Sequence, residues 1–461
     1  MRRSGPQSTP TVLLPDSGTA YARARHAPKA RPLLIRARIV MPVALPSIED
    51  GAVLVRGSKI CAVGRWREIA SRAPSTALEI DLGEVVLLPG LINAHAHLDY
   101  TDMAGQLVPT KSFTDWIKLI TEAKSGWGPD DFAASWRNGA EMLVRSGTTT
   151  VADIETAPDM LPDVWANTPL RVFSFLELTG VRSRIAPETA VKETQDRIAA
   201  LSSGPGRLGV APHAPYSTIP ALLRMVAGAA QSKGWLLTTH VAESVEEYEM
   251  FKHARGPMFE WLKRNNRDMS DCGGITPVAH LDRNGLLGPN LLAVHANYLD
   301  GDDIALLARN GVPVVHCPRS HRYFNHAPFQ YENLLRTGVL VCLGTDSLAT
   351  VIMKRGRKVT LDLFEEMREF ASEFPCRPPG EILRLCTDAP AAALRLSGRI
   401  GCVVPGAMAD LIAVSYEGSI AGVDEAIIAH EGPVAVSMID GRFVWPLPGS
   451  SISQRGAVAT E

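Results

Sequence analysis

The chain has 461 residues and a formal net charge of −2 at pH 7, with 46% hydrophobic and 21% charged residues. Such a length allows one large domain with a smaller one beside it, and the composition is typical of a globular protein. The near-neutral charge argues against a nucleic-acid binder, which carries a basic face. The lack of a long apolar run argues against a membrane-spanning protein.

Seven cysteines are dispersed along the chain without any Cys-x-x-Cys pair. This pattern predicts reduced thiols and a cytoplasmic location. The N-terminal segment is basic, contains several Pro and Ser residues and lacks the apolar run of a secretory signal. We therefore predict a disordered tail over residues 1–32 and a second flexible tail over residues 447–461.

Apolar stretches with the length of short strands occupy both ends of the remaining chain. LLIRARIVM, GAVLVRGSKICAVG and EVVLLPG lie before residue 91, and ADLIAVSY and PVAVSMIDGRFVW lie near the C-terminus. We therefore expect residues 33–88 and 399–446 to build one small β-sandwich, and residues 89–398 to form a separate domain.

The middle of the chain alternates apolar strands with amphipathic helices. One helix is expected between a cap at Asp130 and a stop at Gly147. Eight strands are predicted, at residues 91–98, 148–154, 171–178, 207–215, 236–243, 291–299, 312–320 and 340–347. This alternation predicts an α/β fold, a distorted (β/α)₈ barrel, and the alternative is a doubly wound open sheet.

The motif LINAHAHLDY, residues 91–100, is the most informative part of the sequence. It places His95 and His97 two residues apart in an apolar run that follows the Pro89-Gly90 turn. Residues two apart in a strand point to the same face, so both imidazoles can reach one metal ion.

Further polar side chains stand where other predicted strands end, which is where a barrel of this kind carries its catalytic groups. His240 ends the fifth strand and is followed by Glu243, while His295 ends the sixth strand and Asp346 the eighth. Three imidazoles with one carboxylate are a donor set for Zn²⁺ or Fe²⁺. A single buried His is more often structural, but the recurrence at several strand ends favours a metal site.

These motifs resemble those of the metal-dependent amidohydrolase superfamily, in particular its branch of deaminases and triazine hydrolases. The resemblance covers about residues 33 to 446. It is carried by PGLINAHAHLD, GTTTVAD, APHAPYS, HVAES, VHANYL, HCPRS, LGTDS and the C-terminal GCVVPGAMADLIAV.

The resemblance implies one divalent metal ion, with Zn²⁺ favoured and Fe²⁺ as the alternative. Its implied ligands are His95, His97, His240 and Asp346. Binuclear relatives use a carboxylated lysine from the fourth strand, and RLGVAPHAP at that place contains no lysine, which favours a single ion.

The resemblance also implies that Glu243, His295 and Asp346 are catalytic. In such a site, a bound ion lowers the pKa of a water molecule to about 7. Asp346 then accepts the proton of this water, and His295 hydrogen-bonds to the attacking oxygen. Glu243 protonates a ring nitrogen of the substrate, so we expect its pKa to be raised in a dry pocket.

Contacts to the substrate are harder to assign from the sequence. His213 in APHAPYS matches a position that faces the substrate in the family, although a packing role stays open. Trp116 could stack on an aromatic ring or belong to the core. Arg319 or Arg182 could meet an anionic group, with a structural salt bridge as the alternative for Arg319. His326 could line the pocket or lie at the surface.

The segment HCPRSHRYFNHAPF, residues 316–329, departs from the commoner pattern of this branch, in which Asn follows Ser. It resembles family members that act on aminodeoxyfutalosine, an adenine-containing carboxylate. Cys317 follows His316 directly, and adjacent strand residues point to opposite faces, so we interpret Cys317 as a packing residue rather than a nucleophile.

The sequence therefore predicts a hydrolase that deaminates an amino-substituted N-heterocycle, with aminodeoxyfutalosine as one example. The first alternative is C–N or C–Cl hydrolysis of a triazine or imidazolone, or an amidase, at the same metal site. The second is a barrel without catalytic activity. We expect a small-molecule substrate, no nucleic-acid or membrane partner, and a homodimer as a family trait.

Overall fold

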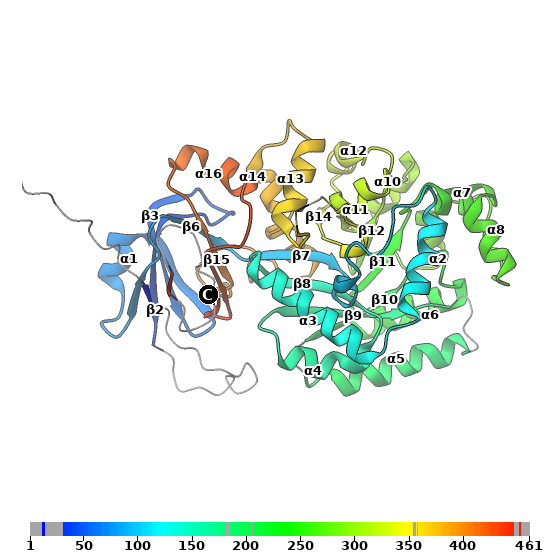
Figure 1. The fold of residues 1–461 in the computed structure, drawn as a ribbon, viewed down its shortest axis with the longest axis horizontal. Coiled ribbons are helices and arrows are strands. Elements are labelled where there is room, and N and C mark those ends of the chain that lie inside the picture. Colours follow the sequence, from blue (N-terminus) through cyan, green and yellow to red (C-terminus); the bar gives the residue numbers. More distant parts are fainter. Residues whose placement is uncertain are drawn as a thin grey trace, which may run out of the picture.

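The computed structural model describes residues 12–13, 31–180, 185–204, 206–353, 356, 358–446 and 451–452. It consists of a barrel and a smaller sheet that lie side by side (Figure 1). No helix in the described part of the chain is long and apolar enough to cross a membrane.

The barrel is built from eight strands whose neighbours are all parallel and follow each other in sequence order. A β-bridge between Ala96 and Asp346 joins the last strand to the first, so the sheet closes. This arrangement confirms the predicted barrel and excludes the doubly wound sheet. The strands are β7 (Leu91–Ala96), β8 (Thr148–Glu155), β9 (Arg171–Leu178), β10 (Arg207–Pro212), β11 (Leu237–Val241), β12 (Leu291–His295), β13 (Val314–His316) and β14 (Val341–Leu343).

Most barrel strands end earlier than the sequence predicts, and the difference falls at the carboxyl ends. Ala242, His295 and Asp346 have positive φ values of 50°, 72° and 53°. Residues other than glycine rarely adopt this left-handed conformation, which ends a strand abruptly. Of the polar residues predicted at strand ends, His240 and His295 therefore lie in the last two residues of their strands, whereas Glu243 and Asp346 lie on the turns that follow.

Helices pack around the outside of the barrel and, in the case of α2 (Phe113–Lys124), across the carboxyl end of its strands (Figure 1). They are α2 (Phe113–Lys124), α3 (Pro129–Arg145), α4 (Leu161–Ala166), α5 (Pro187–Leu201), α6 (Pro220–Lys233), α7 (Val245–His253), α8 (Pro257–Arg264), α9 (Pro277–Arg283), α10 (Gly301–Arg309), α11 (Pro318–Tyr323), α12 (Tyr331–Arg336), α13 (Leu363–Glu373), α14 (Pro379–Arg384) and α15 (Asp388–Ala393). The predicted stop of α3 at Gly147 is confirmed by its φ of 83°. Its predicted cap at Asp130 is wrong, because the helix is capped at Gly128, whose N–H donates to the Asp131 carboxylate at 2.8 Å.

Strands from both chain ends form the second sheet, as predicted. Its order is β17-β16-β15-β6-β2-β3-β4, with β5 paired to β2. Side chains from both halves of this order, such as Val53 and Phe443, share one apolar core, so the sheet folds over on itself. Its elements are β2 (Leu33–Val40), β3 (Ile48–Arg56), β4 (Lys59–Arg65), α1 (Trp66–Arg72), β5 (Leu78–Asp81), β6 (Val85–Pro89), β15 (Leu411–Ser415), α16 (Val423–Ile428), β16 (Val436–Ile439) and β17 (Arg442–Trp445).

The two predicted tails are described only in part. The strand β1 (Val12–Leu13) pairs antiparallel with β18 (Ser451–Ile452), which the sequence did not indicate. The predictions of disorder for residues 1–11, 14–30, 447–450 and 453–461 lie outside the described residues.

The barrel and the second sheet join at the amino ends of the barrel strands. Arg171, the first residue of β9, donates two hydrogen bonds to Asp410 Oδ2 at 3.0 and 3.2 Å. The same guanidinium donates to Asp440 at 2.7 Å, and the Asp440 N–H donates to Asp410 Oδ1 at 2.8 Å. This end of the barrel is thus a structural contact, and it leaves the carboxyl ends for a functional site.

Candidate metal centre

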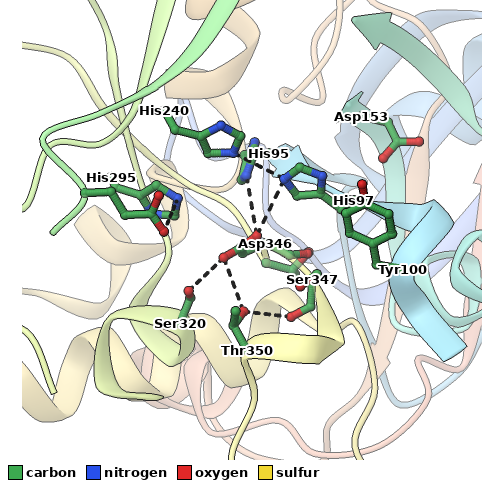
Figure 2. Close-up of polar contacts among 12 residues, drawn as sticks. His95, His97, Tyr100, Asp153, His240, His295, Ser320, Asp346, Ser347 and Thr350 are labelled. Carbon is green, nitrogen blue, oxygen red and sulfur yellow. Dashed lines mark hydrogen bonds and ion pairs between the residues drawn. The ribbon is translucent and has the colours of Figure 1, made fainter. Parts of the chain in front are cut away.

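Three histidines converge at the carboxyl end of the barrel: His95 at the end of β7, His97 directly after it, and His240 on β11 (Figure 2). One ring nitrogen from each of His95, His97 and His240 lies within 4.8 Å of the other two, and all three residues are buried. His97 Nε2 and His240 Nε2 are 3.2 Å apart. The spacing of two residues between His95 and His97 does direct both imidazoles toward one point.

Asp346 completes this cluster from the turn after β14. Its Oδ1 lies 3.6 Å from His95 Nε2 and 3.8 Å from His97 Nε2. Its other oxygen, Oδ2, accepts hydrogen bonds from Ser320 Oγ at 2.7 Å and Thr350 Oγ1 at 3.2 Å (Figure 2). The two hydroxyl groups hold the carboxylate so that one oxygen faces the imidazoles.

The donors of the cluster fit a divalent cation. His240 Nδ1 lies 2.8 Å from the backbone oxygen of His213, to which it can only donate, so its Nε2 lone pair faces the cluster. Burial, the largest cause, lowers the pKa of His240 to about 3 and keeps the ring neutral. His95 Nε2 is buried without a hydrogen-bond partner among the described residues. Buried imidazole nitrogens that lack a hydrogen-bond partner are typical of a metal site.

Glu243 and His295 form a second pair beside the cluster. His295 Nε2 lies 3.4 Å from Glu243 Oε1, and both side chains are buried. Burial raises the pKa of Glu243 well above its usual range, and the charges of Asp346 and Glu247 raise it further. Burial also lowers the pKa of His295 well below its usual range. Burial therefore favours the neutral form of both groups, and a protonated Glu243 carboxyl group can donate its proton.

Asp346 differs from Glu243 although both are buried. Burial alone would raise the pKa of Asp346, but the nearby imidazoles of His95, His295 and His97 hold it well below its usual range. The pKa values of two carboxyl groups in one pocket are thus shifted in opposite directions. Such a division is what a site needs to provide an acid and a base at the same pH.

His213 stands at the more open side of the site. Its ring packs 4.9 Å from that of His240, its Nδ1 lies 2.6 Å from Ser217 Oγ, and its Nε2 lies 3.8 Å from Glu177 Oε1. A quarter of its side chain is exposed, against 1% for His95. Its position is compatible with a substrate contact, as the sequence predicts.

Trp116 and His326 lie on segments that pack against each other near the site. Trp116 on α2 contacts Phe324 edge-on, with ring centroids 5.1 Å apart, and Phe324 lies 5.3 Å from His326. His326 Nδ1 lies 3.3 Å from Tyr298 Oη, and its charged form would interact with His295. The structure thus brings both residues to the His295 side of the cluster.

Arg319 and Arg182 were both predicted as possible contacts to an anionic group of the substrate, and the structure describes only Arg319. The buried guanidinium of Arg319 donates to Glu366 Oε1 and to Glu365 Oε2, each at 2.5 Å. The structure therefore favours the salt bridge that the sequence left open as an alternative, and we do not propose Arg319 as a substrate contact. Arg182 lies outside the described residues.

Cys317 is buried in an apolar cluster, and burial raises its pKa, as expected for a packing thiol.

Several polar residues near the cluster were not singled out from the sequence. Ser320 and Thr350 hold Asp346, Glu177 faces His213, and Tyr100 stacks on His97 with ring centroids 5.3 Å apart. Glu177 stands at the end of a predicted strand, and this signal could have found it. No feature of the sequence distinguishes the two hydroxyl groups from other Ser and Thr residues.

Comparison with known proteins identifies the family. Residues 86–444 match the amidohydrolase family. The chain belongs to this family. Its members are hydrolases, so the sequence-based identification of a hydrolytic enzyme is confirmed.

Two curated relatives are deaminases. The 5-methylthioadenosine/S-adenosylhomocysteine deaminase of Syntrophobacter fumaroxidans is 33% identical over 386 residues, which is 80% of each chain. The aminodeoxyfutalosine deaminase of Deinococcus radiodurans is 30% identical over 347 residues, which covers 72% of this chain and 79% of the relative. A crystal structure of adenosine deaminase from Xanthomonas campestris with bound zinc covers 94% of this chain and 96% of its own. Its TM-score is 0.77 and its identity is 24%, so this likeness concerns the fold.

Proposed function

We propose that this protein is a metal-dependent hydrolase that removes the amino group of an adenine-type ring and releases ammonia. The main observation in support is that Glu243, whose pKa is raised, lies 3.4 Å from His295 beside three buried histidines and Asp346, whose pKa is lowered. Two curated relatives, matched over more than 70% of this chain, act on adenine nucleosides by name.

We infer that the four donors of the cluster hold one divalent ion, and that this ion is Zn²⁺. The proposed ligands are His95, His97, His240 and Asp346. Three imidazoles and one carboxylate are a common zinc donor set, and the structural neighbour from Xanthomonas campestris binds zinc. When bound, such an ion lowers the pKa of a water molecule to about 7.

Glu243 acts as the acid in the proposed reaction. Because its pKa is raised, it carries a proton when the substrate arrives. It donates this proton to a ring nitrogen next to the carbon that bears the amino group, which makes that carbon more electrophilic. After water has added to the carbon, Glu243 helps to transfer a proton to the leaving ammonia.

Asp346 and His295 act on the attacking water. Asp346 is ionised, and its Oδ1 faces the cluster while Oδ2 is bound by Ser320. Oδ1 accepts the proton that the water loses. His295 is neutral and hydrogen-bonds to the attacking oxygen, which stabilises the tetrahedral intermediate.

We further propose that His213, Trp116 and His326 contact the substrate. His213 carries a ring nitrogen toward the more exposed side of the cluster. Trp116 offers an aromatic face from α2, and His326 has a buried Nε2 without a hydrogen-bond partner among the described residues. A heterocycle with polar edges can use all three kinds of contact.

A cytoplasmic location is part of the proposal. All seven cysteines are described, and none forms a disulfide. Free thiols in this number are typical of a reducing compartment.

Metal analysis together with an ammonia-release assay tests the proposal. The purified protein should contain about one zinc per chain. It should release ammonia from at least one of adenosine, 5′-methylthioadenosine, S-adenosylhomocysteine and aminodeoxyfutalosine, and much less from guanine or cytosine. A zinc-loaded protein that releases ammonia from none of the adenine nucleosides would show that the proposed reaction is wrong.

A further inference from the structure

The helix α2 lies across the carboxyl end of the barrel and is held there at its amino end. The backbone N–H groups of Phe113 and Thr114 donate to the Glu246 carboxylate at 3.1 and 2.8 Å. Glu246 follows the catalytic candidate Glu243 by three residues. Trp116 on the same helix contacts Phe324, which lies beside His326. The first turn of α2 is therefore fixed to two segments that surround the site.

The last turn of α2 places Lys124 close to a proposed metal ligand. Lys124 Nζ donates a hydrogen bond to Tyr100 Oη and lies 4.5 Å from the centroid of its ring. The Tyr100 ring stacks on His97 at 5.3 Å with an interplanar angle of 6°. Figure 2 shows Tyr100 beside His97 at the edge of the cluster. One aromatic ring thus separates the ammonium group from the metal centre.

No carboxylate among the described residues forms an ion pair with Lys124, in contrast to Lys118 and Arg319. Lys118 on the same helix pairs with Asp115 at 2.7 Å. Arg319 is likewise neutralised by two glutamates. A partly buried cation that is left unpaired costs free energy, which an anionic ligand would recover.

His213 marks the open side of the same cluster. Its ring packs 4.9 Å from that of His240, and a quarter of its side chain is exposed. A substrate that enters on this side therefore reaches the cluster whose ligand His97 carries the Tyr100 ring that Lys124 contacts.

We propose that Lys124 binds an anionic group at the 5′ end of an adenine nucleoside and thereby selects charged substrates over uncharged ones. This inference rests on the proposed deaminase function and names its substrate class. It gives Lys124 the role of a specificity residue, and it requires no change in the chemistry at the amino group. The anion can be a carboxylate or a phosphate, because an ammonium group binds either.

Four adenine-containing compounds distinguish a carboxylate, a phosphate and an uncharged group at the 5′ end. S-adenosylhomocysteine and aminodeoxyfutalosine carry a carboxylate, adenosine 5′-monophosphate carries a phosphate, and 5′-methylthioadenosine carries no charge at its 5′ end. The kcat and KM of ammonia release are measured for each with the zinc-loaded protein. Zinc content is measured for every variant, so that a loss of metal is not read as a loss of substrate binding.

Lys124→Met is compared with two control variants. Lys118→Met removes a cation from the exposed side of the same helix. Tyr100→Phe removes the hydroxyl group that Lys124 contacts but keeps the ring on His97. Lys124→Arg restores the charge with a different shape. If Lys124 acted only by supporting Tyr100, the Tyr100→Phe variant would reproduce its effect.

We expect Lys124→Met to raise the KM of the preferred anionic substrate about 10-fold or more, because a hydrogen bond to a charged group is lost. Its kcat/KM for 5′-methylthioadenosine should change less than 2-fold, Lys118→Met should match the wild type with both substrates, and Lys124→Arg should recover part of the loss. The anion that responds most identifies the carboxylate or the phosphate.

Three results would overturn the inference. Lys124→Met could impair charged and uncharged substrates equally, Tyr100→Phe could have the same pattern as Lys124→Met, or the wild-type protein could prefer 5′-methylthioadenosine over every anionic substrate. In each of these cases ammonia release persists, so the proposed function stands. Absence of ammonia release from all four compounds would instead remove the proposed function, and this inference with it.

Discussion

Two buried aspartates stand at opposite ends of the barrel and have opposite surroundings. Asp410, at the amino end, is 2% exposed and pairs with the Arg171 guanidinium, while a backbone N–H binds its other oxygen. Asp346, at the carboxyl end, is 6% exposed and faces the imidazoles of His95 and His97 and two hydroxyl groups. No Lys or Arg among the described residues forms an ion pair with Asp346.

The difference shows which end of the barrel serves stability and which serves function. A buried carboxylate needs a cation, and Arg171 provides it for Asp410. For Asp346 the missing positive charge is most simply that of a metal ion. Burial raises the pKa of Asp410, whereas the imidazoles hold that of Asp346 well below its usual range.

Removal of the carboxylate at the metal centre should abolish activity. In Asp346→Ala the cluster loses its only anionic donor, so we expect turnover to fall below detection and the zinc content to drop well below one per chain. Circular dichroism and metal analysis of the purified variant check this. A fully active Asp346→Ala protein would contradict the proposed metal site, even if the barrel fold is unchanged.

Replacement of the acid beside the cluster should separate metal binding from chemistry. Glu243→Gln keeps the size of the side chain but cannot donate a carboxyl proton, so kcat should fall about 10²-fold or more. The zinc content should stay at the wild-type level because Glu243 is not a proposed ligand. Because the protonated form is active, wild-type activity should fall as the pH rises through the raised pKa of Glu243. Unchanged kcat in Glu243→Gln would disprove the proposed proton transfer.

Removal of the carboxylate at the amino end should affect stability instead of activity. Asp410→Ala leaves Arg171 with Asp440 alone, which is half exposed. We expect the free energy of unfolding to fall by about 3 kcal/mol, since a mostly buried charge loses its main partner. Denaturant unfolding measures this, and kcat per folded molecule should stay within 2-fold of the wild type. A selective loss of kcat would show that the two ends of the barrel are not separate in function.

Removal of a hydroxyl group that hydrogen-bonds to Asp346 should have a smaller effect, on the affinity for the metal ion. Ser320→Ala removes the shorter of the two hydrogen bonds to Oδ2, so the carboxylate is less well oriented. We expect the zinc affinity, measured by competition with a chelator, to weaken about 10-fold. Ser146→Ala is the matched control, because this buried hydroxyl group donates only to backbone oxygens away from the site. Equal affinities in the two variants would exclude the proposed orientation by Ser320.

A third kind of buried carboxyl group, which forms no ion pair with any described Lys, Arg or His, should be visible in the pH dependence of stability. Burial raises the pKa of Glu155 to about 8, so this group is protonated in the folded state at neutral pH. Its contribution to stability is complete below the pKa of the unfolded chain, about 4.3, and is lost as the pH rises toward about 8. The free energy of unfolding should therefore fall between about pH 5 and 8 by up to roughly 1 kcal/mol per pH unit more in the wild type than in Glu155→Gln. Parallel curves for the two proteins would show that Glu155 does not titrate in this range.

Much of the fold and the centre of the site could be predicted from local patterns. The eight strands were found because each is an apolar run of the right length, and their count specified the barrel. His95 and His97 were found because residues two apart in a strand always point to the same face. Most strand ends were predicted too late along the chain, because the left-handed turns at Ala242 and Asp346 occur at residues other than glycine, which do not mark such a turn in the sequence. Such turns are stabilised by contacts from other segments, which local propensity does not contain.

The alternation of strands and helices, and the residue types that follow each strand, could be predicted from the amino-acid sequence without the tertiary structure. These properties depend on neighbours along the chain and on the fixed geometry of the backbone. The tertiary structure alone decided the partners of the cations: Arg319 meets two glutamates of α13, whereas Lys124 meets a tyrosine beside a proposed metal ligand. Nothing in the sequence near these residues distinguishes a paired charge from an unpaired one, because their partners are separated from them by more than 20 residues and are brought close only when the chain folds.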